Sequence, residues 1–201
     1  MEKNSFEVMR DLAGYFKEGE RKAIYNAADS SRDKLLIRLL WITGRRIGEI
    51  LKIKVNEVDV QNKSLIIHVE KKSNKDFASL SYIDEFTLNF INTFIIANGL
   101  KDNDYIFKSS FKGNNPISRQ RAFQIIRKAC DKAGINKVGK TKPHPHHFRH
   151  SFAIDQAKNM KNPSDVRKLQ MALNHSTLAV TEKYLRFADE EIKNLPNNVG
   201  N

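Results

Sequence analysis

The sequence predicts a mainly α-helical protein with one small antiparallel β-sheet, an α+β fold class. Most of the chain carries apolar residues at helical spacing, as in residues 85–97, where Phe90 and Phe94 recur at an interval of four. One region differs, because residues 64–69 are rich in β-formers and are followed by a polar turn and the loosely alternating residues 77–83. Together these patterns predict a helical domain that carries a single β-hairpin.

The elements of the N-terminal half follow from caps and apolar spacing. A first helix is expected over residues 15–28, and Ser30 or Ser31 then caps a second one. The buried side of this second helix is expected to carry Leu35, Leu36, Leu39 and Leu40. Gly44 interrupts it, since glycine readily adopts the left-handed conformation that ends helices, and a short helix resumes over residues 46–53.

The C-terminal half is predicted to be mostly helical. Ser118 caps one helix, whose apolar side carries Phe123, Ile126 and Cys130. Pro163 suits the first turn of another helix, because its missing N–H is not needed there. The helices expected after the hairpin cover residues 85–97, 118–133, 145–158, 163–173, 181–187 and 189–194.

Composition indicates a cytoplasmic protein without a membrane segment. Hydrophobic residues make up 40% of the 201 positions, and no apolar run approaches the roughly 18 residues of a membrane helix. The N-terminus lacks the apolar region of a signal peptide. The single Cys130 cannot form an internal disulfide, which favours a reducing compartment.

The positive charge is concentrated in one part of the chain. The net charge is +12, and residues 101–142 hold 11 Lys or Arg against 3 Asp, a net of +8. A polyanionic partner is the natural interpretation, although a solvated basic face fits the charge almost equally well. Charge alone does not separate DNA from RNA or from an acidic membrane.

Tyr184 is the candidate nucleophile of a phosphoryl-transfer reaction. A phenol has a pKa of about 10 and needs a base or cations to become reactive. Arg46 and Arg149 are suited to the nonbridging phosphate oxygens, because a planar guanidinium can hold two oxygens at once. His146 lies three residues before Arg149, on the same helical face, and we expect it to exchange a proton with the tyrosine hydroxyl.

Two further donors complete the predicted set. His175 can donate to a phosphate oxygen, and Lys72, in the polar turn of the hairpin, can protonate the leaving 5′ oxygen. Each of these residues alone suits a structural or solvated role. Their presence in one chain with Tyr184 and the two arginines indicates cleavage of a phosphodiester.

A metal site is the alternative for the histidine cluster. His146 and His150 have the i, i+4 spacing of helical metal ligands. However, His147 occupies the position where a zinc protease carries its general-base glutamate, and Arg149 would repel a cation. We therefore predict no metal site.

Several segments in order resemble the catalytic domain of the tyrosine recombinase family, which includes phage integrases and Xer-type proteins. They are TGRRIGE at residues 43–49, KSNK at 72–75, PHHFRHSFA at 145–153, LNHS at 173–176, and Tyr184. The resemblance extends from about residue 15 to 189. Asn174 departs from the family pattern, which usually has glycine before the histidine.

The resemblance implies a fold, a reaction and a set of site residues. The fold would be that of a tyrosine recombinase catalytic domain. Tyr184 would form a 3′-phosphotyrosyl link that a 5′-hydroxyl reverses, without a metal or nucleotide cofactor. The implied catalytic residues are Arg46, Lys72 (with Lys71 as the alternative register), His146, Arg149, His175 and Tyr184, supported by the acidic Glu49. Contacts to DNA are expected from Arg119, Gln120 and Arg121 at the start of a helix.

The resemblance also implies partners and a domain layout. We expect double-stranded DNA as the partner and a homo-oligomer, from dimer to tetramer, on that DNA. Family members usually carry a separate core-binding domain, which the first 14 residues cannot supply. Either the chain is an excised catalytic domain, or the protein is a minimal form that relies on a partner or on its own multimers. Residues 1–14 are expected to be a leader or linker, 15–195 the catalytic domain and 196–201 a flexible tail. The predicted function is site-specific DNA recombination or integration. The alternatives are a type IB topoisomerase-like nicking and resealing enzyme, or a DNA-binding module that is inactive without the missing domain.

Overall fold

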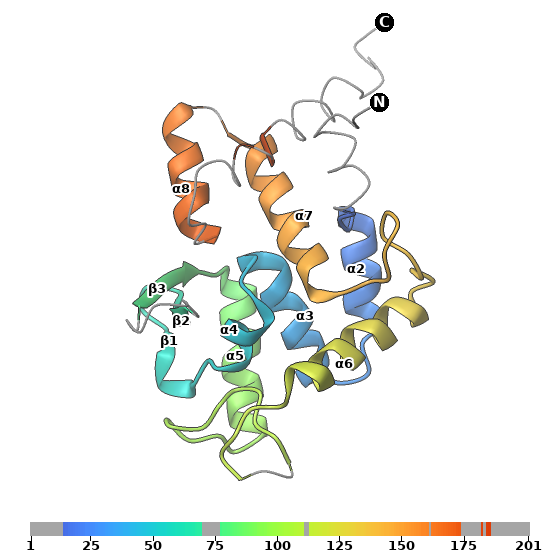
Figure 1. Cartoon of the computed structure of the whole chain (residues 1–201). Coiled ribbons are helices and arrows are strands. Elements are labelled where there is room, and N and C mark those ends of the chain that lie inside the picture. The colour runs from blue at the N-terminus through green and yellow to red at the C-terminus, as the bar shows by residue number, and fades with distance from the viewer. Residues whose placement is uncertain are drawn as a thin grey trace, which may run out of the picture.

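The computed structural model describes residues 14–69, 77–110, 113–160, 162–173, 182, 184 and 185. It confirms the predicted fold class, because helices make up most of the fold and one small antiparallel sheet lies at its side (Figure 1). The α-helices are α2 (Glu18–Ala27), α3 (Ser31–Thr43), α4 (Ile47–Leu51), α5 (Glu85–Ala97), α6 (Arg119–Lys132), α7 (Pro145–Lys158) and α8 (Pro163–Leu173), with a 3-10 turn η1 at Val55–Glu57.

The sheet has three strands in the order β1-β2-β3. They are β1 (Val58–Asp59), β2 (Ser64–Val69) and β3 (Phe77–Tyr82). The predicted hairpin is confirmed as the antiparallel pair β2–β3, in which Ile66 lies opposite Leu80. On the other face of β2, Leu65 and Ile67 are buried in the core. Strand β1 was not predicted, since two residues are too short to show a period in the sequence.

Helix α2 begins three residues later than the sequence predicts, because the preceding backbone is held by side chains. The N–H of Phe16 donates to Ser151 Oγ at 2.9 Å, and the N–H of Lys17 donates to Glu20 Oε2 at 2.7 Å. Lys17 is therefore an extended residue before the first turn. The entry to α2 is fixed by a contact with α7 that no local pattern reveals.

The predicted caps are confirmed, and one apolar assignment is wrong. Ser30, rather than Ser31, accepts the N–H of Asp33 at 3.2 Å, and Ser118 accepts the N–H of Arg121 at 3.1 Å. Phe123, expected on the buried side of α6, is 38% exposed. The buried side of that helix is set instead by Ala122, Ile125, Ile126, Ala129 and Cys130.

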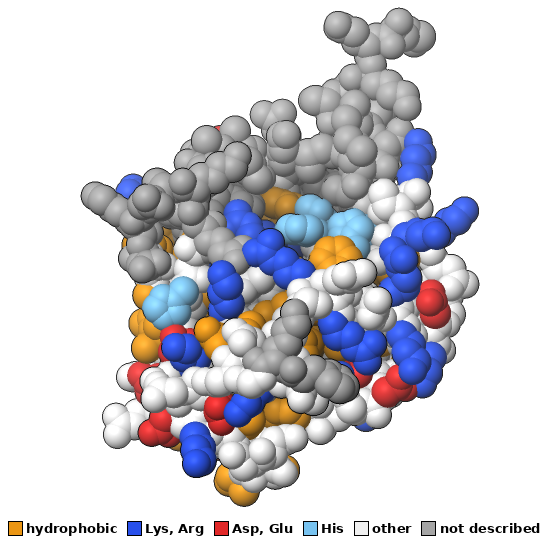
Figure 2. All heavy atoms as spheres, turned by 60° about the horizontal axis from the view of Figure 1, so that its bottom comes forward, with side chains coloured by type: hydrophobic (Ala, Val, Ile, Leu, Met, Phe, Trp, Pro, Cys, Tyr) orange, Lys and Arg blue, Asp and Glu red, His pale blue; other side chains and the backbone are white. Residues whose placement is uncertain are grey.

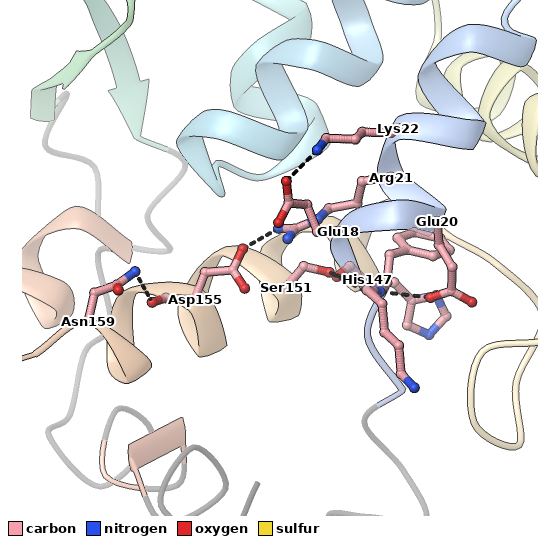
Figure 3. A network of polar contacts seen from close by, with 10 residues as sticks. Glu18, Glu20, Arg21, Lys22, His147, Ser151, Asp155 and Asn159 are labelled. Atoms are coloured by element: carbon pink, nitrogen blue, oxygen red, sulfur yellow. Dashed lines mark hydrogen bonds and ion pairs between the residues drawn. The ribbon is translucent and has the colours of Figure 1, made fainter. Parts of the chain in front are cut away.

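Helix α7 is central to the described part of the molecule. It packs on α3 and on α8 (Figure 1). An ion pair between Arg21 and Asp155, together with the Ser151 hydroxyl, ties α2 to α7 (Figure 3). The end of α7 and α8 form a second apolar cluster beside the main core, and its buried members include Leu173 and Tyr184.

Several predicted segments lie outside the described residues. These are most of the leader at 1–14, the hairpin turn at 70–76, the helix at 189–194 and the tail at 196–201. Of the helix expected over 181–187, Glu182, Tyr184 and Leu185 are described, and all three are helical.

Gly44 lies where the end of α3 approaches α7 most closely. It caps α3 in the left-handed region with φ of 60°, and its N–H donates to Leu40 O at 3.2 Å. A Cβ at this position would overlap the ring of Phe152 on α7. Both the backbone conformation and the close approach therefore require glycine.

We predict that Gly44→Ala destabilises the protein by at least about 1–3 kcal/mol, the usual cost of a non-glycine residue in a strained conformation, with the overlap on Phe152 adding to it. Urea unfolding followed by circular dichroism measures the change. Gly19→Ala is the matched control. Gly19 lies in α2 with open space around it, so alanine there should stabilise by up to about 1 kcal/mol. Equal midpoints for the two variants would contradict the proposed role of Gly44.

Candidate active site

The site is built on the first turns of α7. His144 is the N-cap and Pro145 the first helical residue, so the helix start is set by the sequence. From this start, His146, Arg149 and His150 follow at helical spacing on one side. Figure 2 shows histidine side chains next to a gathering of Lys and Arg side chains on one face of the molecule.

Arg149 links two segments that are far apart in the sequence. Its Nη1 donates to Gly44 O at 3.0 Å, and its Nη2 donates to Leu173 O at the end of α8. The residue is only 5% exposed. Burial, followed by the positive charge of Arg46, lowers the pKa of Arg149 to about 10, so the guanidinium remains charged at neutral pH. A guanidinium has more N–H donors than these two contacts use.

Arg46 is held at the N-terminus of α4 by Glu49. The Glu49 carboxylate accepts the backbone N–H of Arg46 at 3.0 Å and its Nη1 at 3.1 Å. The Glu49 side chain is fully buried, whereas the Arg46 side chain is 36% exposed. Arg46 therefore keeps part of its guanidinium toward solvent while its base is fixed.

Arg45, which the sequence analysis assigned no role, is buried and directed to the sheet. Its Nε donates to Ser81 Oγ at 2.8 Å, and its Nη2 donates to Ser79 Oγ at 2.7 Å and to Leu80 O at 3.1 Å. It thus ties the end of α3 to strand β3. The alternating serines of β3 were the only sequence signal for this contact.

Tyr184 meets a histidine other than the one expected. Its hydroxyl lies 2.7 Å from Nδ1 of His150, and its ring is buried in the second apolar cluster. Burial raises the pKa of the Tyr184 hydroxyl, and the charge of Arg149 opposes this effect. The motifs predict this role for His146, whereas the structure brings His150, one turn further along α7, to the hydroxyl.

His146 lies close to the arginines. Partial desolvation, followed by the positive charges of Arg149 and Arg46, lowers its pKa. These electrostatic neighbours are the two residues expected to hold a phosphate. His146 is more exposed than Arg149 and is open to a ligand from solvent.

His147 is a structural residue. Its Nδ1 accepts the N–H of His144 at 3.1 Å, so the neutral ring carries its proton on Nε2, which lies 3.1 Å from Thr141 Oγ1. The Thr141 hydroxyl donates in turn to Val138 O. The His147 ring stacks on the ring of His144, with 3.7 Å between the ring centroids, and makes an edge-to-face contact with Phe16. Burial above all lowers the pKa of His147 to about 3.

Five predicted site residues remain, and the structure describes three of them. Lys72 and His175 lie outside the described residues. Arg119, Gln120 and Arg121 are exposed in the first turn of α6. The Arg119 guanidinium lies against Gly48 of α4, where an added Cβ would come within 2.5 Å of Nη2. The start of α6 is therefore next to the helix that Arg46 caps.

Within the described residues, no group of three or more His, Cys, Asp or Glu side chains is arranged to hold a metal ion. In the same part of the chain, no helix is long and apolar enough to span a membrane.

Comparison with known families decides the relationship. Residues 15–191 match the model of the phage integrase family. The chain belongs to the phage integrase family. The resemblance seen in the sequence motifs is thereby confirmed, and the family match covers the segments that supply Arg46, Arg149 and Tyr184.

Curated relatives of this phage integrase family member are longer proteins. Tyrosine recombinase XerA of Pyrococcus horikoshii is 29% identical over 189 residues, which cover 92% of this chain and 61% of the relative. Tyrosine recombinase XerA of Thermococcus onnurineus is 30% identical over 163 residues, covering 81% of this chain and 53% of the relative. The chain therefore spans between about half and two thirds of the length of these relatives.

Solved structures show the same fold. The crystal structure of XerA recombinase superposes with a TM-score of 0.72 at 24% identity, covering 92% of this chain and 64% of the other. A XerH site-specific recombinase bound to palindromic difH substrate also gives 0.72, at 21% identity, covering 90% and 52%. These likenesses confirm the predicted tyrosine recombinase catalytic-domain fold.

We predict that acid destabilises the protein partly through His147. The unfolded chain takes up this proton near pH 6.5, whereas the folded ring stays neutral to about pH 3. Stability is therefore unaffected above about pH 6.5 and is lost between these values by about 1.4 kcal/mol per pH unit. From pH 7 to pH 5 the loss is about 2 kcal/mol for this one group.

The measurement is urea unfolding at a series of pH values for the wild type and His147→Gln. The variant lacks the titrating ring, so its free energy of unfolding should fall less steeply between pH 7 and pH 5. An unchanged slope would mean that His147 is not held neutral in the folded state.

Proposed function

We propose that this chain is the catalytic part of a site-specific DNA recombinase that cleaves and rejoins DNA through a 3′-phosphotyrosyl intermediate, using neither metal nor nucleotide. The observation that carries the proposal is the placement of the Tyr184 hydroxyl among the groups of α7, with His150 at 2.7 Å and Arg149 acting on its pKa. A buried phenol that contacts an imidazole and is influenced by the charge of Arg149 suits the attack on an anionic phosphodiester better than a purely structural role.

The proposed reaction follows from the charges of the site. Arg46 and Arg149 hold the nonbridging oxygens of the scissile phosphate, where negative charge accumulates in the transition state. His146 lies beside both arginines and donates to the same oxygens. The Tyr184 oxygen forms a bond to phosphorus as the bond to the 5′ oxygen breaks. In the second half, a 5′-hydroxyl attacks the phosphotyrosine and releases Tyr184.

Other members of the proposed site have supporting roles. Lys72 protonates the leaving 5′ oxygen and His175 donates to a phosphate oxygen, as expected from their motifs. Glu49 fixes Arg46 through its backbone and side chain, so we assign it a supporting role. We propose that the exposed Arg119, Gln120 and Arg121 contact DNA. The position of Arg119 against Gly48, in the helix that Arg46 caps, supports a contact close to the scissile phosphate.

The partner we propose is double-stranded DNA, bound by several copies of the protein. Among the structural neighbours, λ integrase is found as a dimer bound to a COC' core site and as a tetramer bound to a Holliday junction. The net charge of +8 over residues 101–142 supports an acidic polymer as the ligand. We assign residues 15–195 as the catalytic domain, and we propose that a separate core-binding domain completes the grip on DNA.

We predict that Tyr184→Phe abolishes covalent attachment to DNA and leaves DNA affinity nearly unchanged, because the variant lacks only the nucleophilic oxygen. The assay incubates the protein with nicked suicide substrates, including random-sequence pools, in excess chelator and resolves the products on a denaturing gel. An adduct that survives in Tyr184→Phe would identify another nucleophile. DNA binding in a native gel without an adduct from the wild type would support the inactive binding module instead.

We also predict that cleavage occurs in cis, since His150 and Arg149 act on the Tyr184 of the same chain. Alone, Tyr184→Phe should not cleave DNA, and Arg149→Ala should cleave it about 10²–10³ times more slowly than the wild type. A mixture of the two should remain inactive, because neither protein holds a complete site. Cleavage that returns on mixing, measured by covalent trapping, would show that the tyrosine is donated between protomers.

A further inference from the structure

The contact between His150 and Tyr184 is a long-range one. The residues are 34 positions apart, and Nδ1 lies 2.7 Å from the phenol oxygen, at the distance of a good hydrogen bond. Their ring centroids are 5.8 Å apart at a tilt of 39°, so the contact is made by the edges of the rings. A proton can pass directly between the two atoms without a bridging water.

The charge states of the pair allow the phenol to donate this hydrogen bond to His150. Burial, followed by the positive charges that His146, His144 and Arg149 can carry, lowers the pKa of His150 to about 4. The ring is therefore neutral at pH 7. Burial raises the pKa of Tyr184, so the phenol keeps its proton. With both groups neutral, the imidazole tautomer that carries its proton on Nε2 leaves Nδ1 free to accept the phenol proton.

His146 and His150 lie on the same side of α7 but have different neighbours. His146 is influenced by Arg149 and Arg46, the residues proposed to hold the phosphate. His150, one turn further along α7, contacts the phenol. A donor to the phosphate and an acceptor for the nucleophile are different tasks, and the site supplies one imidazole for each.

We propose that His150 is the proton acceptor for Tyr184 during DNA cleavage. As the Tyr184 Oη–P bond forms and the P–O5′ bond breaks, the phenol proton moves to Nδ1 of His150. In resealing, the same proton returns to Oη as the phosphotyrosine bond breaks. The inference rests on the proposed function and adds to it a catalytic residue that the sequence motifs did not indicate.

The resting site disfavours this proton transfer, and bound DNA would favour it. Burial and the nearby positive charge of Arg149 make the neutral His150 a weak base. A phosphodiester held by Arg149 and Arg46 would bring negative charge close to His150, which stabilises an imidazolium and raises the basicity of the ring. The base is thus switched on by the substrate, so that Tyr184 is not activated in its absence.

The test compares single-turnover cleavage of a suicide substrate by the wild type and by His150→Gln, with Tyr184 either natural or replaced by 3,5-difluorotyrosine. Glutamine can hold a hydrogen bond to the phenol but cannot take its proton at neutral pH. We expect His150→Gln to lose about 10²–10⁴ in cleavage rate, the usual contribution of a general base. The fluorinated phenol ionises more readily, so it should restore much of that loss.

Matched controls separate the possible failures. Arg149→Ala should also cleave slowly, but difluorotyrosine should not rescue it, because its defect lies in phosphate stabilisation. Thermal unfolding and DNA affinity of His150→Gln should stay close to those of the wild type. A wild-type rate in His150→Gln would overturn the inference and leave the proposed function standing. A loss without rescue by difluorotyrosine would also overturn it. Failure of the wild type itself to form an adduct would count against the proposed function.

Discussion

The arrangement of the site depends on the two hydrogen bonds that Arg149 makes to backbone carbonyls. One carbonyl belongs to Gly44 at the end of α3, and the other to Leu173 at the end of α8. These carbonyls stand directly before the segments that carry Arg46 and His175. A single buried guanidinium therefore joins the ends of α3 and α8, which are more than a hundred residues apart in the sequence. By accepting these hydrogen bonds, the carbonyls offset part of the free-energy cost of burying the charged guanidinium.

The Arg149 guanidinium also adds to an excess of positive charge in the site. Arg45, Arg46 and Arg149 lie close enough to influence one another, and the buried carboxylate that opposes them is Glu49. The neighbouring histidines respond by remaining neutral, since burial and nearby cations lower their pKa values. Such a site suits an anionic ligand. Under the proposed function this ligand is the scissile phosphodiester, whose negative charge Arg46 and Arg149 would offset.

Two sides of helix α7 have different tasks: one holds the helix in place, and the other carries the proposed catalytic residues. His147 and Ser151 face α2 and the preceding loop, where they bond to Thr141 and to the backbone of Phe16. His146 and His150 each lie one position earlier in the helix. His146 is influenced by the charges of Arg149 and Arg46, and His150 contacts the Tyr184 hydroxyl. His147 and Ser151 are hydrogen-bonded and His147 is neutral at pH 7, so these contacts fix the orientation of α7. In the proposed reaction, a fixed α7 would hold His146, Arg149 and His150 in place relative to the phosphate.

The sequence by itself determined the fold class, the β2–β3 hairpin, the serine caps, the end of α3 at Gly44 and the order of the motifs. These features are local, since periodicity, cap chemistry and backbone freedom are properties of neighbouring residues. Only the tertiary structure decided that Arg45 is bound to β3, that Phe123 is left exposed and that Tyr184 meets His150 rather than His146. Helical spacing placed both histidines on one face, but which of them meets the phenol depends on how a segment 34 residues away packs against α7. That packing results from long-range burial, which no local pattern encodes.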